Sequence, residues 1–190
     1  MITDVNQVLT VDIIVLSNDI ESHAFRAILE SFNIQTRMHY IGNVKHLIAL
    51  FQTPNYLYKN IIICCHGDKD GMFIPELSPE LEEIMPYHKK LTPSNLSSFL
   101  NLHDQVVVNT GCCLGSENFA KSFLQRGAAA YIGASDYIEG NDTILFIVNF
   151  FYFYFVKSMS IKEAFHKAIS IEEGSKMMKL WQGDGNISKV

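Results

Sequence analysis

The chain has 190 residues, of which 48% are hydrophobic and 18% charged, and its formal net charge is −5. This is the composition of an ordinary globular protein, and the length suits one domain with a sizeable core. An acidic chain whose lysines and arginines are scattered singly lacks the basic surface of a nucleic-acid-binding or membrane-binding protein. We therefore expect a single domain over residues 1–190 that binds neither nucleic acid nor membrane.

Strands and helices alternate along the first half of the chain. The predicted strands, which are apolar and rich in β-branched residues, are residues 11–16, 34–41 and 61–65. Between them lie a helix over 21–32 and a second helix capped by Asn43, each with apolar side chains on one face. The stretch from Gly67 to Leu91 contains three prolines and is predicted to be irregular, and loops of this length are often functional.

The second half continues the alternation, and the tail from about residue 174 shows no clear pattern. The predicted elements are a helix starting at Thr92-Pro93, a strand from Val106, a helix between Ser116 and Gly127, a strand over 128–134, a helix over 141–157 and a last helix with a Ser160–Glu163 capping box. Strands that alternate with helices of this length predict a mostly parallel sheet covered by helices on both faces.

The run from Ile144 to Val156 is the most apolar part of the chain. It has thirteen residues between Asp142 and Lys157, whereas a helix that spans a bilayer needs about 20. We expect a buried helix, with a dimer or receptor surface as the alternative.

The four cysteines form two adjacent pairs, Cys64–Cys65 and Cys112–Cys113. Adjacent cysteines on strands are not the pattern of a secreted disulfide framework, so free thiols in a reducing compartment are expected. The first residues lack the basic and apolar segments of a secretory signal. These features indicate a cytoplasmic protein.

Two strand ends carry residues that could perform catalysis. The 61–65 strand leads into His66-Gly67, and the strand from Val106 leads through Gly111 into Cys112. Because reactive groups gather beyond the carboxyl ends of parallel strands, His66 and Cys112 can meet as base and nucleophile. A nearby imidazole lowers the pKa of a thiol and later protonates the leaving amine. The N–H groups of Gly67 and Cys112 could donate to an oxyanion.

The other cysteines and histidines are interpreted as structural or surface groups. Cys64 and Cys65 are expected to face the core, since cysteine is among the most buried residue types. Adjacent cysteines lack the C-x₂₋₄-C spacing of structural zinc sites. No metal and no cofactor is predicted.

From His66 onward, the order of these features resembles the caspase-like cysteine peptidases of clan CD, and most of all their bacterial CHAT-type members. That family has a strand ending in His-Gly, followed by a strand ending in an Ala-Cys-x-Thr/Ser-Gly-like motif. Here the second motif reads Gly111-Cys112-Cys113-Leu114-Gly115, and the offset from cysteine to glycine selects Cys112 as nucleophile. The resemblance covers about residues 60–170. Glycine at 111 in place of alanine is a change that conserves size, and Cys113-Leu114 replaces the usual polar pair.

The resemblance implies a caspase-like three-layer sandwich with a mostly parallel central sheet, His66 as base and acid, and Cys112 as nucleophile. It implies an endopeptidase that acts on protein substrates in regulated cell death or antiviral defence, activated by a separate partner or sensor protein. In the family, residues before the nucleophile and after the fifth strand line the pocket for the residue that precedes the cut. Here these are Asn109, Thr110, Ser135 and Asp136. The charge of Asp136 would favour a basic residue in that pocket.

Two other interpretations remain open. Gly111 to Gly115 also match a G-x-C-x-G nucleophile elbow, which would make Cys113 the nucleophile of a glutamine amidotransferase-like or α/β-hydrolase-like enzyme. The histidine of such an enzyme follows its nucleophile, and His166 is the only downstream histidine. The third interpretation is a non-catalytic module on the same fold that recruits partners, or a second copy, through the aromatic residues of 144–156.

Overall fold

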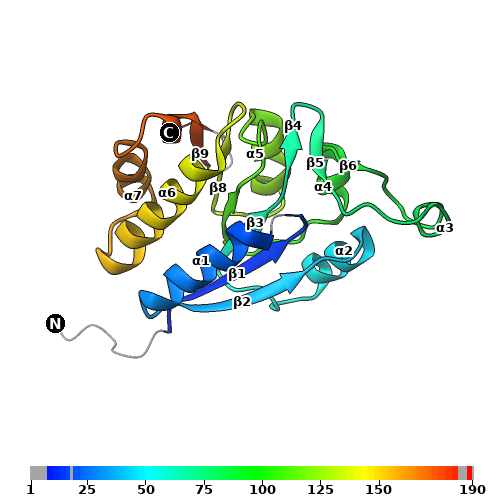
Figure 1. Cartoon of the computed structure of the whole chain (residues 1–190), viewed down its shortest axis with the longest axis horizontal. Helices are drawn as coiled ribbons and strands as arrows, with labels where there is room; N and C mark the ends of the chain where they lie inside the picture. Colours follow the sequence, from blue (N-terminus) through cyan, green and yellow to red (C-terminus); the bar gives the residue numbers. More distant parts are fainter. Residues whose placement is uncertain (1–7, 18, 184–187, 190) are drawn as a thin grey trace.

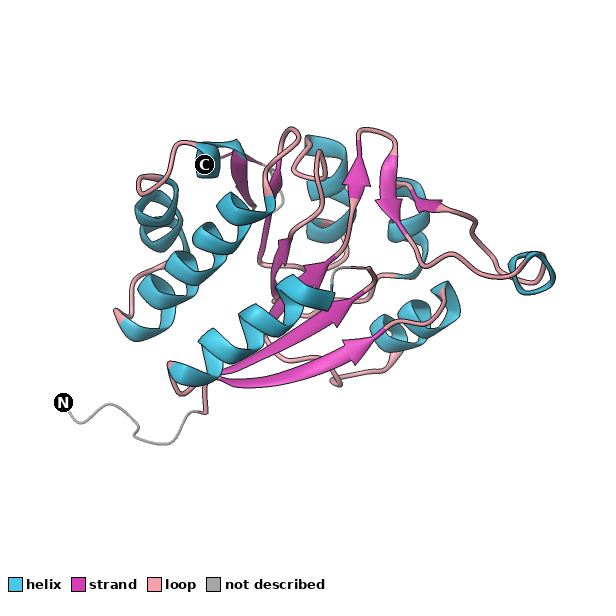
Figure 2. Ribbon diagram, viewed as in Figure 1, coloured by secondary structure: helices cyan, strands magenta, loops and turns pink. Residues whose placement is uncertain are grey.

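The computed structural model describes residues 8–17, 19–183 and 188–189. Within these residues, a twisted central sheet is covered by helices on both faces (Figures 1 and 2). In spatial order, its strands are β10 (Ser188–Lys189), β9 (Met178–Gln182), β8 (Ala130–Ala134), β7 (Val106–Asn109), β3 (Asn60–Cys64), β1 (Thr10–Val15) and β2 (Gln35–Tyr40). The strands from β8 to β2 are mutually parallel, and β9 and β10 run antiparallel to their neighbours. The predicted mostly parallel sheet is confirmed.

The helices form two layers, one on each side of the sheet. One face is covered by α1 (Asp19–Ser31), α6 (Gly140–Phe151) and α7 (Ile161–Ile169), and the other by α2 (Val44–Gln52), α4 (Pro93–Phe99) and α5 (Glu117–Leu124). Alternate residues of a strand therefore enter different cores: Ile61 and Ile63 pack with α2, α4 and α5, whereas Ile62 packs with α1, α6 and α7. Burial on both faces explains why these strands are continuously apolar.

Most helix ends follow the signals in the sequence. Asn43 accepts a hydrogen bond from the N–H of His46, and capping boxes begin at Thr92 and Ser160. Ser116 occupies the N-cap position of α5 but makes no side-chain capping hydrogen bond there. Gly127 follows α5 with φ +99°, a left-handed conformation that favours glycine.

The stretch between Gly67 and Leu91 is more ordered than predicted. It forms a second, antiparallel sheet of β4 (Gly67–Asp68), β5 (Gly71–Phe73) and β6 (Lys90–Leu91). Between β5 and β6 the chain extends away from the body as an arm, residues 75–88, that carries the short helix α3 (Pro79–Glu82) (Figure 1). Strands of two or three residues are too short to show a hydrophobic periodicity, so the sequence pattern did not indicate this sheet.

The structure also defines the aromatic segment of residues 144–156 and the tail from residue 174. Helix α6 continues as a π-helical turn, η1 (Tyr152–Val156), and Phe146, Phe150 and Phe151 are fully buried. Most of the stripe is therefore core rather than a free surface. In the tail, η2 (Gly174–Met177) leads into β9, which pairs with β8.

In the described part of the chain, none of the helices combines the length and the apolar character needed to cross a bilayer.

Candidate active site

The sheet register brings the two predicted catalytic strand ends together. β3 and β7 are parallel neighbours in which Ile63 is paired with Asn109. His66 and Cys112 each lie three residues beyond this pair, so they leave the same edge of the sheet at the same level. Neighbouring strands are about 4.8 Å apart. The two loops that follow β3 and β7 therefore begin side by side.

Leu114 fills the space between these loops. A Cβ added to Gly67 would lie 2.8 Å from Leu114 Cδ1 and 3.0 Å from the carbonyl oxygen of Cys112. A Cβ added to Gly111 would lie 2.4 Å from the same Cδ1 and 3.1 Å from Cys65 Sγ. The fully buried Leu114 side chain thus occupies room that two glycines leave open.

This packing gives a steric reason for glycine at position 111. The Cβ of an alanine there would lie 2.4 Å from Leu114 Cδ1, so glycine at this position leaves room for the Leu114 side chain. Glycine at 111 and leucine at 114 form one steric unit.

The loop of residues 111–115, named the nucleophile loop after the predicted role of Cys112, accepts hydrogen bonds from two side chains of the sheet. The phenol of Tyr131 donates to the carbonyl oxygen of Leu114 at 2.8 Å, and the indole of Trp181 donates to that of Gly115 at 3.0 Å. Two backbone bonds add to this support, from Cys113 N to Asp136 O at 3.1 Å and from Gly115 N to Ala134 O at 2.6 Å. Four hydrogen bonds therefore support this loop.

Cys112 differs from the other thiols in its exposure. It is partly exposed, and its Sγ lies 3.7 Å from the carbonyl oxygen of Ile138. Cys64, Cys65 and Cys113 are buried, and burial raises the pKa of each of these three thiols. A raised pKa disfavours the reactive thiolate. Within the described residues, Cys112 is therefore the cysteine that an external reagent reaches most readily.

Cys113 has one feature of an elbow nucleophile, a left-handed backbone with φ +63°. Its other features do not suit that role. The residue is 9% exposed, and both its burial and the negative charge of Asp136 raise the pKa of its thiol. His166, the histidine that this alternative requires, lies on the exposed side of α7, next to Phe165.

The backbone of His66 is held on both sides while its side chain is exposed. Its N–H donates to Ser17 Oγ at 3.1 Å, and its carbonyl oxygen accepts from Phe73 N at 3.0 Å. In an antiparallel ladder, bonded residues alternate with residues whose N–H and C=O point away from the partner strand. His66 is hydrogen-bonded to Phe73 of β5, and Gly67 is the next residue along the strand. The N–H of Gly67 is therefore directed away from β5.

The four predicted substrate-binding residues fall into two groups. Asn109 is fully buried and accepts hydrogen bonds from Gly111 N and Cys65 Sγ, and the hydroxyl of Thr110 accepts from Cys65 N. These two side chains support the loop from within. Ser135 and Asp136 are exposed at the end of β8, beside the nucleophile loop.

Two further residues lie near the site, Asp68 and Tyr137, and of these Tyr137 was not predicted from the sequence. Asp68 forms an ion pair with Lys90 at 2.5 Å and accepts from Asp70 N and Gly71 N in the β4–β5 turn. Tyr137 is exposed, and the negative charge of the Cys113 thiolate raises its pKa. Among the described residues, no His, Cys, Asp and Glu side chains form a group that could hold a metal ion.

Comparison by sequence finds no relatives: no family model and no curated protein matches the chain. Comparison by structure finds solved structures that share this fold, two of the following three being described as cysteine proteases. Arg-specific cysteine proteinase gingipain R matches with a TM-score of 0.55 and 10% identity over 88% of this chain and 44% of its own. Separase from the Saccharomyces cerevisiae separase–securin complex matches with a TM-score of 0.58 and 12% identity, over 92% of this chain and 12% of its own.

The third match is a secreted C11 cysteine protease from Bacteroides thetaiotaomicron, in complex with an irreversible peptide inhibitor. Its TM-score is 0.56 at 12% identity, over 93% of this chain and 66% of the protease. The chain thus spans less than two thirds of each matched protein. At such identities the likeness concerns the fold alone: this chain has the caspase-like α/β fold of these cysteine proteases.

Proposed function

We propose that the protein is a cysteine endopeptidase with His66 as base and acid and Cys112 as nucleophile. The observation that carries this proposal is the shared register of the two residues on neighbouring strands, three positions beyond the Ile63–Asn109 pair. The partly exposed Cys112 supports it, because the neighbouring Cys113 is buried. The fold shared with gingipain R and the C11 protease agrees with this activity.

The proposed reaction follows from the positions of three residues. His66 takes the proton of the Cys112 thiol, and the thiolate attacks the carbonyl carbon of the scissile peptide bond. The resulting oxyanion accepts hydrogen bonds from the N–H groups of Gly67 and Cys112. As the C–N bond breaks, His66 protonates the leaving amine. Water, deprotonated by His66, then hydrolyses the thioester and releases the acid and the thiol.

The substrate residue before the cut is proposed to meet the loop after β8. Ser135 and Asp136 are exposed there, and Asp136 O accepts from Cys113 N, which places this loop against the nucleophile loop. A carboxylate at this position favours a basic side chain by charge complementarity. Asn109 and Thr110, being buried, are assigned to the support of the loop.

The cellular role is proposed from the CHAT-type resemblance: regulated cell death or antiviral defence in bacteria, with activation by a partner protein. Separase, one of the matched proteins, was determined in a complex with securin, which agrees with control of this fold by a partner. The four free cysteines agree with the reducing cytoplasm.

The experiment that tests the activity is hydrolysis of an unfolded protein, with the new termini identified by mass spectrometry. Cys112→Ser and His66→Ala are expected to abolish cleavage, whereas Cys113→Ser, a change at the adjacent thiol, is expected to retain it. Loss of cleavage in Cys113→Ser with retention in Cys112→Ser would instead support the elbow enzyme.

A further inference from the structure

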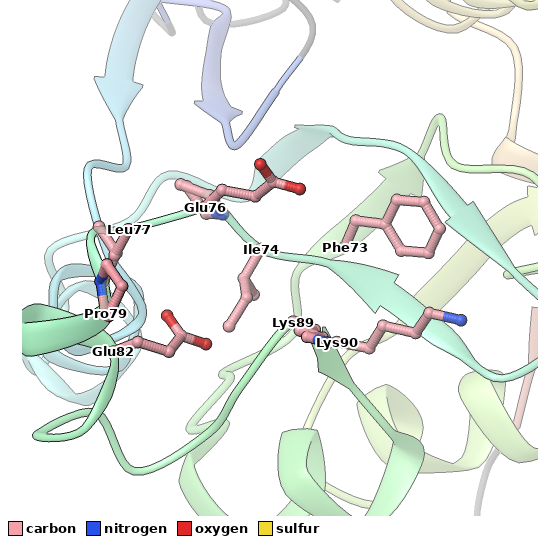
Figure 3. Close-up of a pocket in the computed structure, with 9 residues that line it drawn as sticks. Phe73, Ile74, Glu76, Leu77, Pro79, Glu82, Lys89 and Lys90 are labelled. Atoms are coloured by element: carbon pink, nitrogen blue, oxygen red, sulfur yellow. The ribbon is translucent and has the colours of Figure 1, made fainter.

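A pocket of about 500 Å³ lies between β5, the first part of β6 and the arm of residues 75–88. Figure 3 shows its lining: Ile74 lies at its centre, with Leu77 and Pro79 on the arm side and Phe73 on the other. Ile74 is buried and the other apolar side chains are at least partly exposed, so the pocket offers an apolar floor with an open mouth.

The pocket lies next to the strand that pairs with the His66 segment. Phe73, which lines it, donates its backbone N–H to the carbonyl oxygen of His66 at 3.0 Å. Lys90, which also lines it, is paired with Asp68, the residue that follows Gly67. Since a hydrogen-bonded strand pair is about 5 Å wide, the pocket begins one strand away from His66.

The charges around the pocket are unevenly distributed. The arm carries four glutamates and no lysine or arginine between residues 75 and 88. Glu76 and Glu82 line the pocket at its arm end, and Lys89 and Lys90 stand at the β6 end (Figure 3). The charge of Lys90 is balanced by Asp68 at 2.5 Å and Asp70 at 3.7 Å. At the arm end, Glu82 Oε1 lies 3.4 Å from His88 Nδ1, and Glu76 adds a second carboxylate. Two carboxylates at one end of the pocket attract a positive charge.

We propose that this pocket is an exosite for the substrate: it binds a bulky apolar side chain of the polypeptide, next to a lysine or arginine, a few residues from the cut. This inference rests on the proposed peptidase function. An extended chain advances about 3.3 Å per residue, so a segment three to six residues from the scissile bond crosses β5 and reaches the pocket. Filling the apolar floor is expected to improve kcat/KM roughly tenfold, the effect typical of an apolar side chain in a pocket.

The test uses the full chain and a peptide library made from a cell extract by cleavage after glutamate, which keeps lysine and arginine inside the peptides. Cleavage sites are identified by mass spectrometry and aligned on the cut. The expected result is enrichment of a bulky apolar residue beside a basic one, at a fixed distance of three to six residues on one side. Leu77→Ser should remove the apolar preference, and Glu82→Lys the basic one.

Two neighbouring positions provide matched controls. Leu81→Ser and Glu83→Lys make the same changes on exposed arm residues that do not line the pocket, and both should leave the preferences intact. Cleavage sites that show no enrichment beyond the residues flanking the cut would overturn the exosite. Equal effects of the pocket variants and the control variants would do the same. Neither result would contradict the proposed peptidase activity. A wild-type chain in which an active-site label modifies Cys113 and not Cys112 would overturn the proposed peptidase site and this inference with it.

Discussion

Gly111→Ala tests whether Leu114 sets the spacing between the two catalytic loops. The φ of Gly111 lies outside the left-handed region, so alanine is compatible with the backbone and the effect of the change is steric. The new Cβ would lie 2.4 Å from Leu114 Cδ1, about 1.1 Å inside the ~3.5 Å separation of carbon atoms in contact. Because Leu114 is fully buried, its side chain has little room to retreat.

Gly111→Ala is expected to lower the free energy of unfolding by about 1–3 kcal/mol, the usual effect of an added methyl group in a packed core. Leu114→Ala should cost about 2–5 kcal/mol through the cavity that it leaves. In the double variant the new methyl occupies part of that cavity, so the combined cost should fall below the sum by about 1–2 kcal/mol. In each single variant, an active-site label should also modify Cys112 more slowly than in the wild type, because both changes move the loop of residues 111–115.

The assay is urea unfolding followed by the fluorescence of Trp181, the only tryptophan of the chain, whose indole is bonded to the nucleophile loop. Unfolding midpoints of the wild type, both single variants and the double variant complete a double-mutant cycle. If the loss of unfolding free energy in the double variant equals the sum of the two single losses to within about 0.5 kcal/mol, Gly111 and Leu114 do not act as one steric unit.

Two further predictions concern groups that support the sheet and the loop. Trp181→Phe removes the hydrogen-bond donor to the carbonyl oxygen of Gly115 and should lower the free energy of unfolding, measured in urea, by about 1–2 kcal/mol. An active-site label should also modify Cys112 more slowly in this variant. An unchanged labelling rate would contradict the positioning role of Trp181. The second concerns Asp12: its burial alone would raise its pKa, but hydrogen bonds from His39 and Arg37 outweigh that effect and lower the pKa. Because the unfolded chain then binds the proton more readily, the stability from this carboxylate is present above the ordinary pKa of about 3.9 and is lost as pH falls through the lower folded value. Asp12→Asn should lower the free energy of unfolding by about 3 kcal/mol at neutral pH. It should also weaken the loss of stability that the wild type shows as the pH becomes acidic. A variant whose stability falls with acid as steeply as that of the wild type would contradict this role of Asp12.

Much of the fold could be predicted because its signals are local. Continuous β-branched runs mark strands buried on both faces, and Asn43, Thr92 and Ser160 mark helix starts through the hydrogen bonds of their own side chains. The shared register of His66 and Cys112 also follows from a local rule, since parallel strands end at the same edge of a sheet.

The parts that could not be predicted depend on contacts between distant segments. Trp181 lies in a tail without periodicity, and its bond to Gly115 arises only because β9 adds to the edge of β8. Similarly, a Cβ at Gly111 would meet Cys65 Sγ at 3.1 Å, and only the folded chain brings Cys65 next to this loop. The burial of Asn109 and Thr110 has the same origin, since both lie beneath the loop that follows them.

The pairing of His66 with Cys112 is tested by mapping the cysteine that a trace amount of a peptidyl acyloxymethyl ketone modifies, in the wild type and in His66→Ala. Mass spectrometry identifies the modified cysteine, and circular dichroism checks that the variant keeps the fold. We expect labelling of Cys112 in the wild type and loss of that labelling in His66→Ala. Labelling of Cys113, or labelling of Cys112 that is unaffected by His66→Ala, would contradict this pairing.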